Sequence, residues 1–152
     1  MEATHQASQP LRPNISGTRH VIVAGHYLAS QAGLQVLEAG GNAIDAGVAA
    51  GIALSVVESE MVSFAGVAPI ILYVAETQEV VTISGLGGWP QAASCEYFHQ
   101  HHDGAIPKGI ARTVVPGAPD AWITALERYG TMRFGEVAAA AIRFAREGIA
   151  MY

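Results

Sequence analysis

The stretch Leu37-Glu-Ala-Gly-Gly-Asn-Ala-Ile-Asp-Ala46 decides the fold, because it contains the signals that end one helix and begin another. The pair Gly40-Gly41 can adopt the left-handed conformation that commonly stops a helix, and Asn42 is a preferred N-cap residue. Apolar residues recur at three- and four-residue steps on both sides of this turn. The sequence therefore predicts two consecutive helices, over 27–39 and 43–57.

The other elements are predicted from patterns of the same kind. A β-branched run over 20–24 predicts a buried strand ahead of the first helix, and runs over 67–74 and 79–83 predict an antiparallel hairpin. Apolar residues at helical steps predict helices over 117–129 and 134–147, after a polar loop that contains histidines. A hairpin combined with segregated helices predicts an α+β fold.

Composition and charge exclude several classes of protein. The 152 residues are 51% hydrophobic and contain no cluster of Lys or Arg, so nucleic acid is not an expected partner. The longest apolar stretch, 43–57, is shorter than the roughly 20 residues that cross a bilayer, so no membrane is expected either. Residues 1–10 are polar and do not resemble a signal peptide, which favours a cytoplasmic location. Residues 1–18 lack an apolar period and predict an extended arm.

Two motifs are weak candidates for ligand binding. Gly85-Leu-Gly-Gly-Trp-Pro90 begins like a dinucleotide-binding turn, but Pro90 replaces the last glycine of that motif, so no nucleotide cofactor is expected. The run His99-Gln-His-His-Asp103 has groups that ligate transition metals, but its spacing matches no closed zinc site. We expect an exposed polar loop there and no metal.

Three carboxylates and one cysteine are candidates for chemistry. Asp45 could act as an acid, but a favourable charge in the first turn of a helix explains it better. Glu58 and Glu60 follow a buried helix, where carboxylates usually need a partner, so structural and functional roles are equally open for them. Cys95 is the only cysteine; it is expected to be buried and receives no role.

Three blocks of sequence occur in an order that one known family shares. They are residues 24–33 running into Leu37–Ala46, then Val114-Val-Pro-Gly-Ala118, then Arg128-Tyr-Gly-Thr-Met132. In these blocks the chain resembles the γ-glutamyltransferase (γ-glutamyltranspeptidase) family of N-terminal-nucleophile hydrolases. The resemblance implies that residues 19–152 are the N-terminal portion of a large subunit, and a fragment of a layered α-β-β-α fold.

The resemblance also implies a proenzyme that cleaves itself into a large and a small subunit. A threonine at the new N-terminus of the small subunit would attack the amide carbonyl of the substrate, with its own amine as the base. Thr113 and Thr124 lie inside this chain and have no free amine, so no catalytic residue is assigned here. The expected partners are the remainder of the large subunit and the small catalytic subunit, and the chain alone is expected to be inactive.

The loop after the second hairpin strand departs from the family. The family has an arginine there that binds the substrate's α-carboxylate, and alignment on Pro90 puts Leu86 in its place. The substrate-facing wall is predicted to be Gly85, Leu86, Gly87, Gly88 and Trp89, since glycines let backbone amides approach a ligand and Trp89 offers a flat apolar face. A plain strand-ending turn is the equally weighted alternative.

The predicted function is part of an amidohydrolase or acyltransferase that cleaves a small amide. This amide is not strictly a γ-glutamyl compound, because Leu86 cannot form the bidentate contact that an arginine makes with a carboxylate. The alternative comes from another class of protein: a stand-alone binding module that keeps this part of the fold and has lost catalysis.

Overall fold

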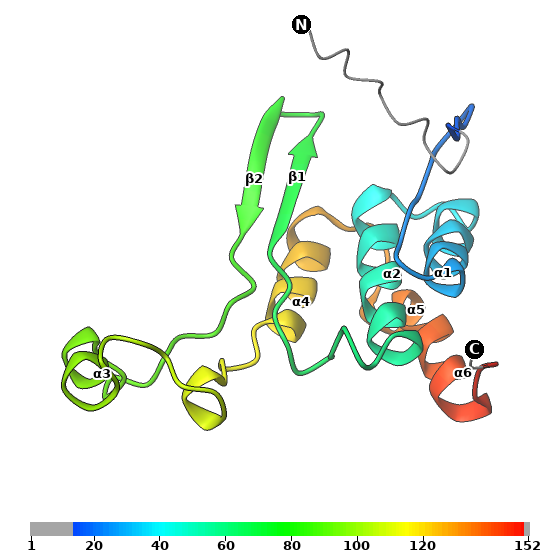
Figure 1. The fold of residues 1–152 in the computed structure, drawn as a ribbon. Helices are drawn as coiled ribbons and strands as arrows, with labels where there is room; N and C mark the ends of the chain where they lie inside the picture. The colour runs from blue at the N-terminus through cyan, green and yellow to red at the C-terminus, as the bar shows by residue number, and fades with distance from the viewer. Residues whose placement is uncertain (1–13, 151–152) are drawn as a thin grey trace, which may run out of the picture.

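The computed structural model describes residues 14–150, which form helices beside a two-stranded sheet (Figure 1). In chain order the elements are α1 (Tyr27–Glu38), α2 (Ala43–Val57), β1 (Ile70–Val74), β2 (Glu79–Ile83), α3 (Cys95–His102), η1 (Ile110–Arg112), α4 (Ala118–Tyr129), α5 (Phe134–Val137) and α6 (Ala139–Glu147). The predicted α+β class is confirmed. Of the predicted arm, residues 1–13 lie outside the described residues, and 14–18 form neither helix nor strand.

The turn between α1 and α2 has the predicted caps. Gly40 has a φ of +94°, and the Asn42 side chain accepts hydrogen bonds from the N–H groups of Ile44 (2.9 Å) and Asp45 (3.0 Å). Asp45 in turn accepts a hydrogen bond from the Asn42 N–H at 2.8 Å, which completes a capping box. The two helices therefore end and begin close to where the sequence predicts.

The strand predicted over 20–24 is wrong. Within residues 14–150 the sheet contains only β1 and β2, and the segment 20–24 runs past the helices instead. Ile22 packs against the helical core, whereas Val23 is 79% exposed. The alternation of a strand is thus present in the burial of the side chains, but no neighbouring strand among the described residues supplies the hydrogen bonds that a sheet requires.

Two further segments differ from the prediction. The expected histidine-containing loop includes α3, whose N-cap Ser94 accepts a hydrogen bond from Tyr97 N–H through its hydroxyl at 3.1 Å. The single helix predicted over 134–147 is divided at Ala138 into α5 and α6, because the chain tightens there and Ala138 N–H is shared between the carbonyls of Phe134 and Glu136. The second hairpin strand lies at 79–83 as predicted and α4 begins one residue later than predicted, whereas the first hairpin strand begins at Ile70 and not at residue 67.

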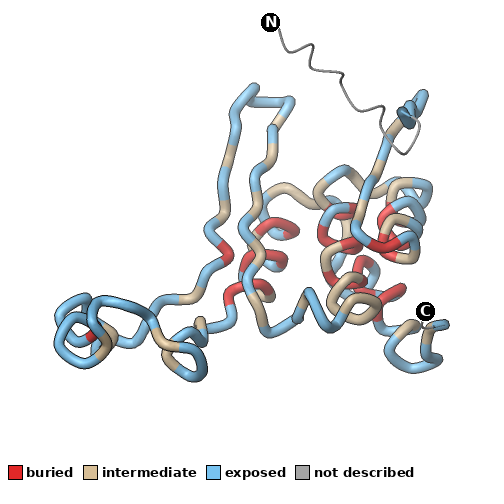
Figure 2. Tube along the Cα trace, viewed as in Figure 1, coloured by how far each residue is buried: buried red, intermediate tan, exposed pale blue. Residues whose placement is uncertain are grey.

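The core lies around α2, which contacts α1, α4, α5 and α6 (Figure 2). Many of its buried side chains are alanines, whose small size lets helix backbones come close. Trp122 of α4 is 5% exposed, and its indole lies against Gly51 of α2. This arrangement buries α2 on most sides. No helix within residues 14–150 is both long and apolar enough to cross a membrane.

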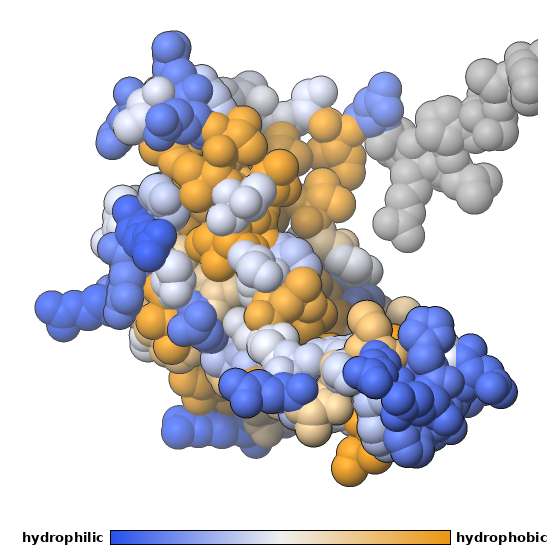
Figure 3. All heavy atoms as spheres, turned by 90° about the vertical axis from the view of Figure 1, so that its left-hand side faces the viewer, coloured by the Kyte–Doolittle hydropathy of each residue, from blue (hydrophilic) through white to orange (hydrophobic). Residues whose placement is uncertain are grey.

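The hairpin carries apolar side chains on both faces. Ile70 and Ile83 pack against the helical core, and they alternate with Ile71, Tyr73 and Val80 on the opposite face. The last three are 75%, 58% and 65% exposed. Hydrophobic residues accordingly gather on the side of the molecule that carries the hairpin (Figure 3). One face of the hairpin is thus covered by described residues and the other is open.

Candidate functional site

The loop that follows β2 is held between two other segments of backbone. The carbonyl oxygen of Gly85 accepts a hydrogen bond from Ala68 N–H at 3.1 Å, and Gly87 N–H donates to the carbonyl oxygen of Val115 at 3.1 Å. The first contact ties the loop to the approach to β1, and the second ties it to the segment before α4. The loop is therefore fixed on both sides.

Glycine is required at Gly85 and Gly87 by this close approach. Gly85 has a φ of +58°, a conformation that other L residues rarely adopt, and a Cβ there would collide with the carbonyl of Ala68. A Cβ on Gly87 would collide with the carbonyl of Val115. At Gly88 the same space is open. The first half of the loop thus packs backbone against backbone, and its second half does not.

A cavity of about 500 Å³ lies between this loop and α4. One wall is formed by residues 82–87, and the opposite wall by Asp120, Thr124 and Arg128 of α4. Of the five predicted substrate-facing residues, the structure therefore brings Gly85, Leu86 and Gly87 to a cavity. Leu86 is 55% exposed, so its side chain is accessible to a ligand.

The other two predicted wall residues lie beside this cavity but do not line it. Trp89 is 41% exposed and packs against Phe98 of α3, with the ring centroids 5.7 Å apart. Its indole therefore holds α3 to the loop while keeping part of its surface accessible.

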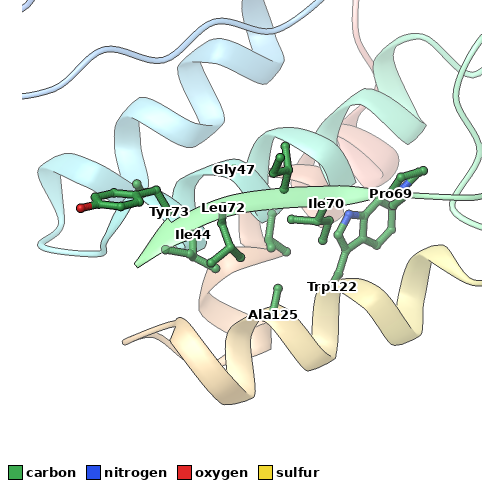
Figure 4. Close-up of a pocket in the computed structure, with 12 residues that line it drawn as sticks. Ile44, Gly47, Pro69, Ile70, Leu72, Tyr73, Trp122 and Ala125 are labelled. Atoms are coloured by element: carbon green, nitrogen blue, oxygen red, sulfur yellow. The ribbon is translucent and has the colours of Figure 1, made fainter. Parts of the chain in front are cut away.

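A second cavity, of about 540 Å³, lies between β1 and the helices α2 and α4 (Figure 4). Ile70 and Leu72 line it from β1, Ile44 from α2, and Trp122 and Ala125 from α4. None of its lining residues is charged. It can bury apolar groups, and Tyr73 is the one lining residue whose side chain carries a group for acid–base chemistry.

Asp45 is fully buried and joins distant parts of the chain. Its carboxylate accepts hydrogen bonds from Thr131 N–H (3.0 Å), the Thr131 hydroxyl (2.7 Å) and Met132 N–H (3.2 Å). The Asn42 side-chain amide adds a link by donating to the Tyr129 carbonyl at 2.6 Å. The carboxylate thus accepts all of these hydrogen bonds from donors within the chain. This confirms the interpretation of Asp45 as a structural charge.

The same contacts set the charge state of Asp45. Burial by itself raises the pKa of the carboxyl, but hydrogen bonds from the Thr131 side chain and from the backbone of Asn42, Thr131 and Met132 favour the ionised form. Together they hold the pKa below its ordinary value of 3.8. A carboxylate that stays ionised and hydrogen-bonded is poorly suited to proton transfer near neutral pH.

The other carboxylate candidates, Glu58 and Glu60, line one cavity of about 430 Å³ together with His26. Glu58 is the half-buried C-cap of α2, and its carboxylate lies against Gly25, whereas Glu60 is exposed. Within residues 14–150, no group of three or more His, Cys, Asp or Glu side chains could hold a metal ion.

The histidine run 99–103 belongs to a helix and its cap. His101 stacks on Tyr97 of the same helix, with ring centroids 4.7 Å apart, and Asp103 is the C-cap in the left-handed conformation. Cys95, expected to be buried, is exposed at the first residue of α3. Because α3 has so little chain around it, its side chains pack mostly on one another.

Sequence reasoning missed the polar face of α4. Asp120, Thr124 and Arg128 are four residues apart and line the cavity, while Ala121 and Trp122 on the other face are buried. The polar spacing is visible in the sequence. Nothing local indicates, however, that this face of the helix meets the loop after β2.

Comparisons with known proteins agree with this fold. The sequence profile of the Gamma-glutamyltranspeptidase family matches residues 29–152. The chain is 38% identical over 143 residues to Acylase ACY 1 proenzyme of Pseudomonas sp. (strain SE83), covering 88% of this chain and 25% of that protein. It is 34% identical over 140 residues to Glutathione hydrolase-like YwrD proenzyme of Bacillus subtilis (strain 168), covering 91% and 26%.

A solved structure shows the same arrangement of elements. The crystal structure of Helicobacter pylori gamma-glutamyltranspeptidase superposes with a TM-score of 0.77 and 28% sequence identity, covering 91% of this chain and 40% of that one. The chain spans about a quarter of the length of the curated relatives that it matches. It belongs to the gamma-glutamyltranspeptidase family, and it corresponds to the N-terminal part of the family's large subunit.

Proposed function

We propose that this chain is part of an N-terminal-nucleophile amidohydrolase or acyltransferase that cleaves a small amide, and that the loop Gly85–Trp89 forms one wall of its substrate site through Gly85, Leu86 and Gly87. The observation that carries this proposal is the cavity of about 500 Å³ beside a loop that backbone hydrogen bonds fix on both sides. A fixed loop can hold a substrate in one orientation without a cost of ordering on binding. The names of the relatives, acylase and glutathione hydrolase, support the reaction class.

The threonine nucleophile and the other walls of the site are proposed to come from the rest of the protein, as the remainder of the large subunit and a small catalytic subunit. Two observations support this. The relatives are named proenzymes and are about four times as long as this chain. The outer face of the hairpin is apolar and uncovered among the described residues, as expected of a face that packs on further structure. The chain alone is therefore proposed to have no amidase activity.

The substrate is proposed not to be restricted to γ-glutamyl compounds. Leu86 is accessible at the cavity, but its aliphatic side chain cannot bind a carboxylate by charge-assisted hydrogen bonds. Its neighbour Gly87 has no room for a Cβ, so a supporting acidic residue cannot be placed there. A change of specificity must therefore be tested at Leu86 alone.

The test compares amides in the complete protein. We expect the wild type to cleave simple acyl amides, and we expect Leu86→Arg to raise kcat/KM for a γ-glutamyl amide by roughly tenfold, the size of one charge-assisted contact. Leu86→Gln is the matched neutral control and should leave the ratio between substrates unchanged. Absence of cleavage of every amide by the complete protein would contradict the proposed function. A strong wild-type preference for γ-glutamyl amides would contradict only the assignment of Leu86.

A further inference from the structure

The N-terminal end of α1 is capped by a histidine. The Nδ1 atom of His26 accepts a hydrogen bond from Leu28 N–H at 3.1 Å, and the first turn of α1 contains no acidic residue. The His26 ring also stacks on Tyr27, with the ring centroids 4.6 Å apart, and His26 is only 4% exposed. The first turn of α1 therefore takes its side-chain cap from a buried ring that can change its charge.

The hydrogen bond to Leu28 determines where the protons of this ring lie. A ring nitrogen that accepts a hydrogen bond carries no proton, so a neutral His26 has its proton on Nε2. A second proton can bind only at Nδ1, which would then be a donor and could not accept from Leu28 N–H. The charged ring would also lie at the positive end of the helix dipole. Protonation of His26 and capping of α1 therefore exclude each other.

The cavity of about 430 Å³ beside this cap contains partners for a protonated ring. His26 lines it together with Glu58 and Glu60, and the Glu58 carboxylate lies against Gly25, the residue before His26. Both glutamates follow the C-terminal end of α2, where the helix dipole is negative. The ion pairs found among residues 14–150 involve neither of them. The other lining residues carry no charge; they are Val56, Val57, Ser59, Ile149 and Ala150.

We propose that His26 is a pH-sensitive switch between two arrangements. The neutral ring caps α1 through Nδ1, whereas the protonated ring releases Leu28 N–H and is stabilised by the carboxylates of Glu58 and Glu60. Because histidine changes its charge between about pH 5 and 8, the first turn of α1 opens within this range as the pH falls. The switch involves none of the residues of the proposed substrate wall, so each can fail without the other.

The experiment measures hydrogen exchange at the start of α1 in the complete protein. The exchange rate of the Leu28 amide is compared at about pH 7.5 and about pH 5.5, after correction for the intrinsic effect of pH on exchange. In the wild type the corrected rate should rise roughly fivefold at the lower pH, which is the size of the loss of one helix cap. In His26→Asn it should be the same at both pH values, because asparagine caps a helix and does not titrate.

Further variants test the role of the carboxylates. Glu58→Gln combined with Glu60→Gln removes the charges that stabilise the protonated ring, so the rise in exchange should move to lower pH. Glu96→Gln, at an exposed acid of α3, is the matched control and should leave the rise where it is. His26→Ser also supplies a cap oxygen, and it repeats the comparison if His26→Asn does not fold.

Three results would overturn the proposal. The first is a corrected exchange rate that does not change with pH in the wild type, and the second is one that rises equally in the wild type and in the His26 variants. The third is a rise that stays at the same pH when both glutamates are replaced, since the carboxylates would then not stabilise the protonated ring.

Discussion

The helical layer and the hairpin of this molecule differ in whether the chain itself provides partners for their side chains. In the helical layer even a fully buried charge, Asp45, finds all its partners within the chain. In the hairpin, Ile71 and Val80 are apolar and yet 75% and 65% exposed. The buried charge of the helical layer is therefore satisfied within the chain, whereas the outer face of the hairpin is apolar and uncovered among the described residues.

The largest effect is expected from removing the buried charge of the helical layer. Asp45→Ala should lower the free energy of unfolding of the complete protein by about 3–4 kcal/mol, because the buried N–H groups of Thr131 and Met132 lose their acceptor. Glu96 is also a first-turn acid, but in the exposed helix α3, and Glu96→Ala should cost less than about 0.5 kcal/mol. Urea unfolding measures both. Equal losses would show that the hydrogen bonds of the buried Asp45 contribute no more to stability than an exposed first-turn acid does.

The pH dependence of the same variant sharpens the comparison. The folded-state pKa of Asp45 lies below its ordinary value, so its contribution to stability is fully present above about pH 4 and is lost as the pH falls through the folded-state pKa. The difference in unfolding free energy between wild type and Asp45→Ala should therefore be constant from pH 7 to pH 5 and shrink in more acidic solution. A difference that grew as the pH fell would contradict a lowered pKa of Asp45 in the folded protein.

The next effect concerns the junction between the two halves. Gly85→Ala should destabilise the complete protein by about 2–3 kcal/mol and reduce amide cleavage, because a Cβ meets the Ala68 carbonyl and the residue has a positive φ. Gly88→Ala, at a position with open space in the same loop, should change stability by less than about 0.5 kcal/mol. Thermal unfolding and activity assays distinguish them. A Gly85→Ala protein with normal stability would contradict the close backbone packing.

The smallest effect tests whether the outer face of the hairpin is covered in the complete protein. Ile71→Ser should cost about 2 kcal/mol in the complete protein, the value of one buried aliphatic side chain, and almost nothing in the isolated chain. In the isolated chain it should also reduce binding of hydrophobic dyes. Ile70→Ser on the neighbouring, partly buried position should destabilise both forms. If Ile71→Ser did not change the free energy of unfolding of the complete protein, the outer face of the hairpin would be exposed there too.

The parts of the fold that could be predicted are those that local chemistry determines. The caps at Gly40 and Asn42 act within one turn of the chain, so the sequence places them correctly. The strand predicted over 20–24 was wrong because an extended β-branched segment has the same burial pattern beside a helix as beside a strand. In the candidate site, Gly85 and Gly87 were predictable because glycine marks close backbone approach. The place of Arg128 at the same cavity was not predictable, because it depends on how α4 packs.

The hydrogen bonds of Asp45 also have a consequence for the order of events during synthesis. Thr131 follows Asp45 by 86 residues. At a translation rate of 5–20 residues per second, the partner emerges from the ribosome about 4–17 s after the carboxylate. During that interval only the local capping box with Asn42 can hold the charge. The paired helices α1 and α2 therefore lack their contacts with α4 and with the segment that binds Asp45 until that interval has passed.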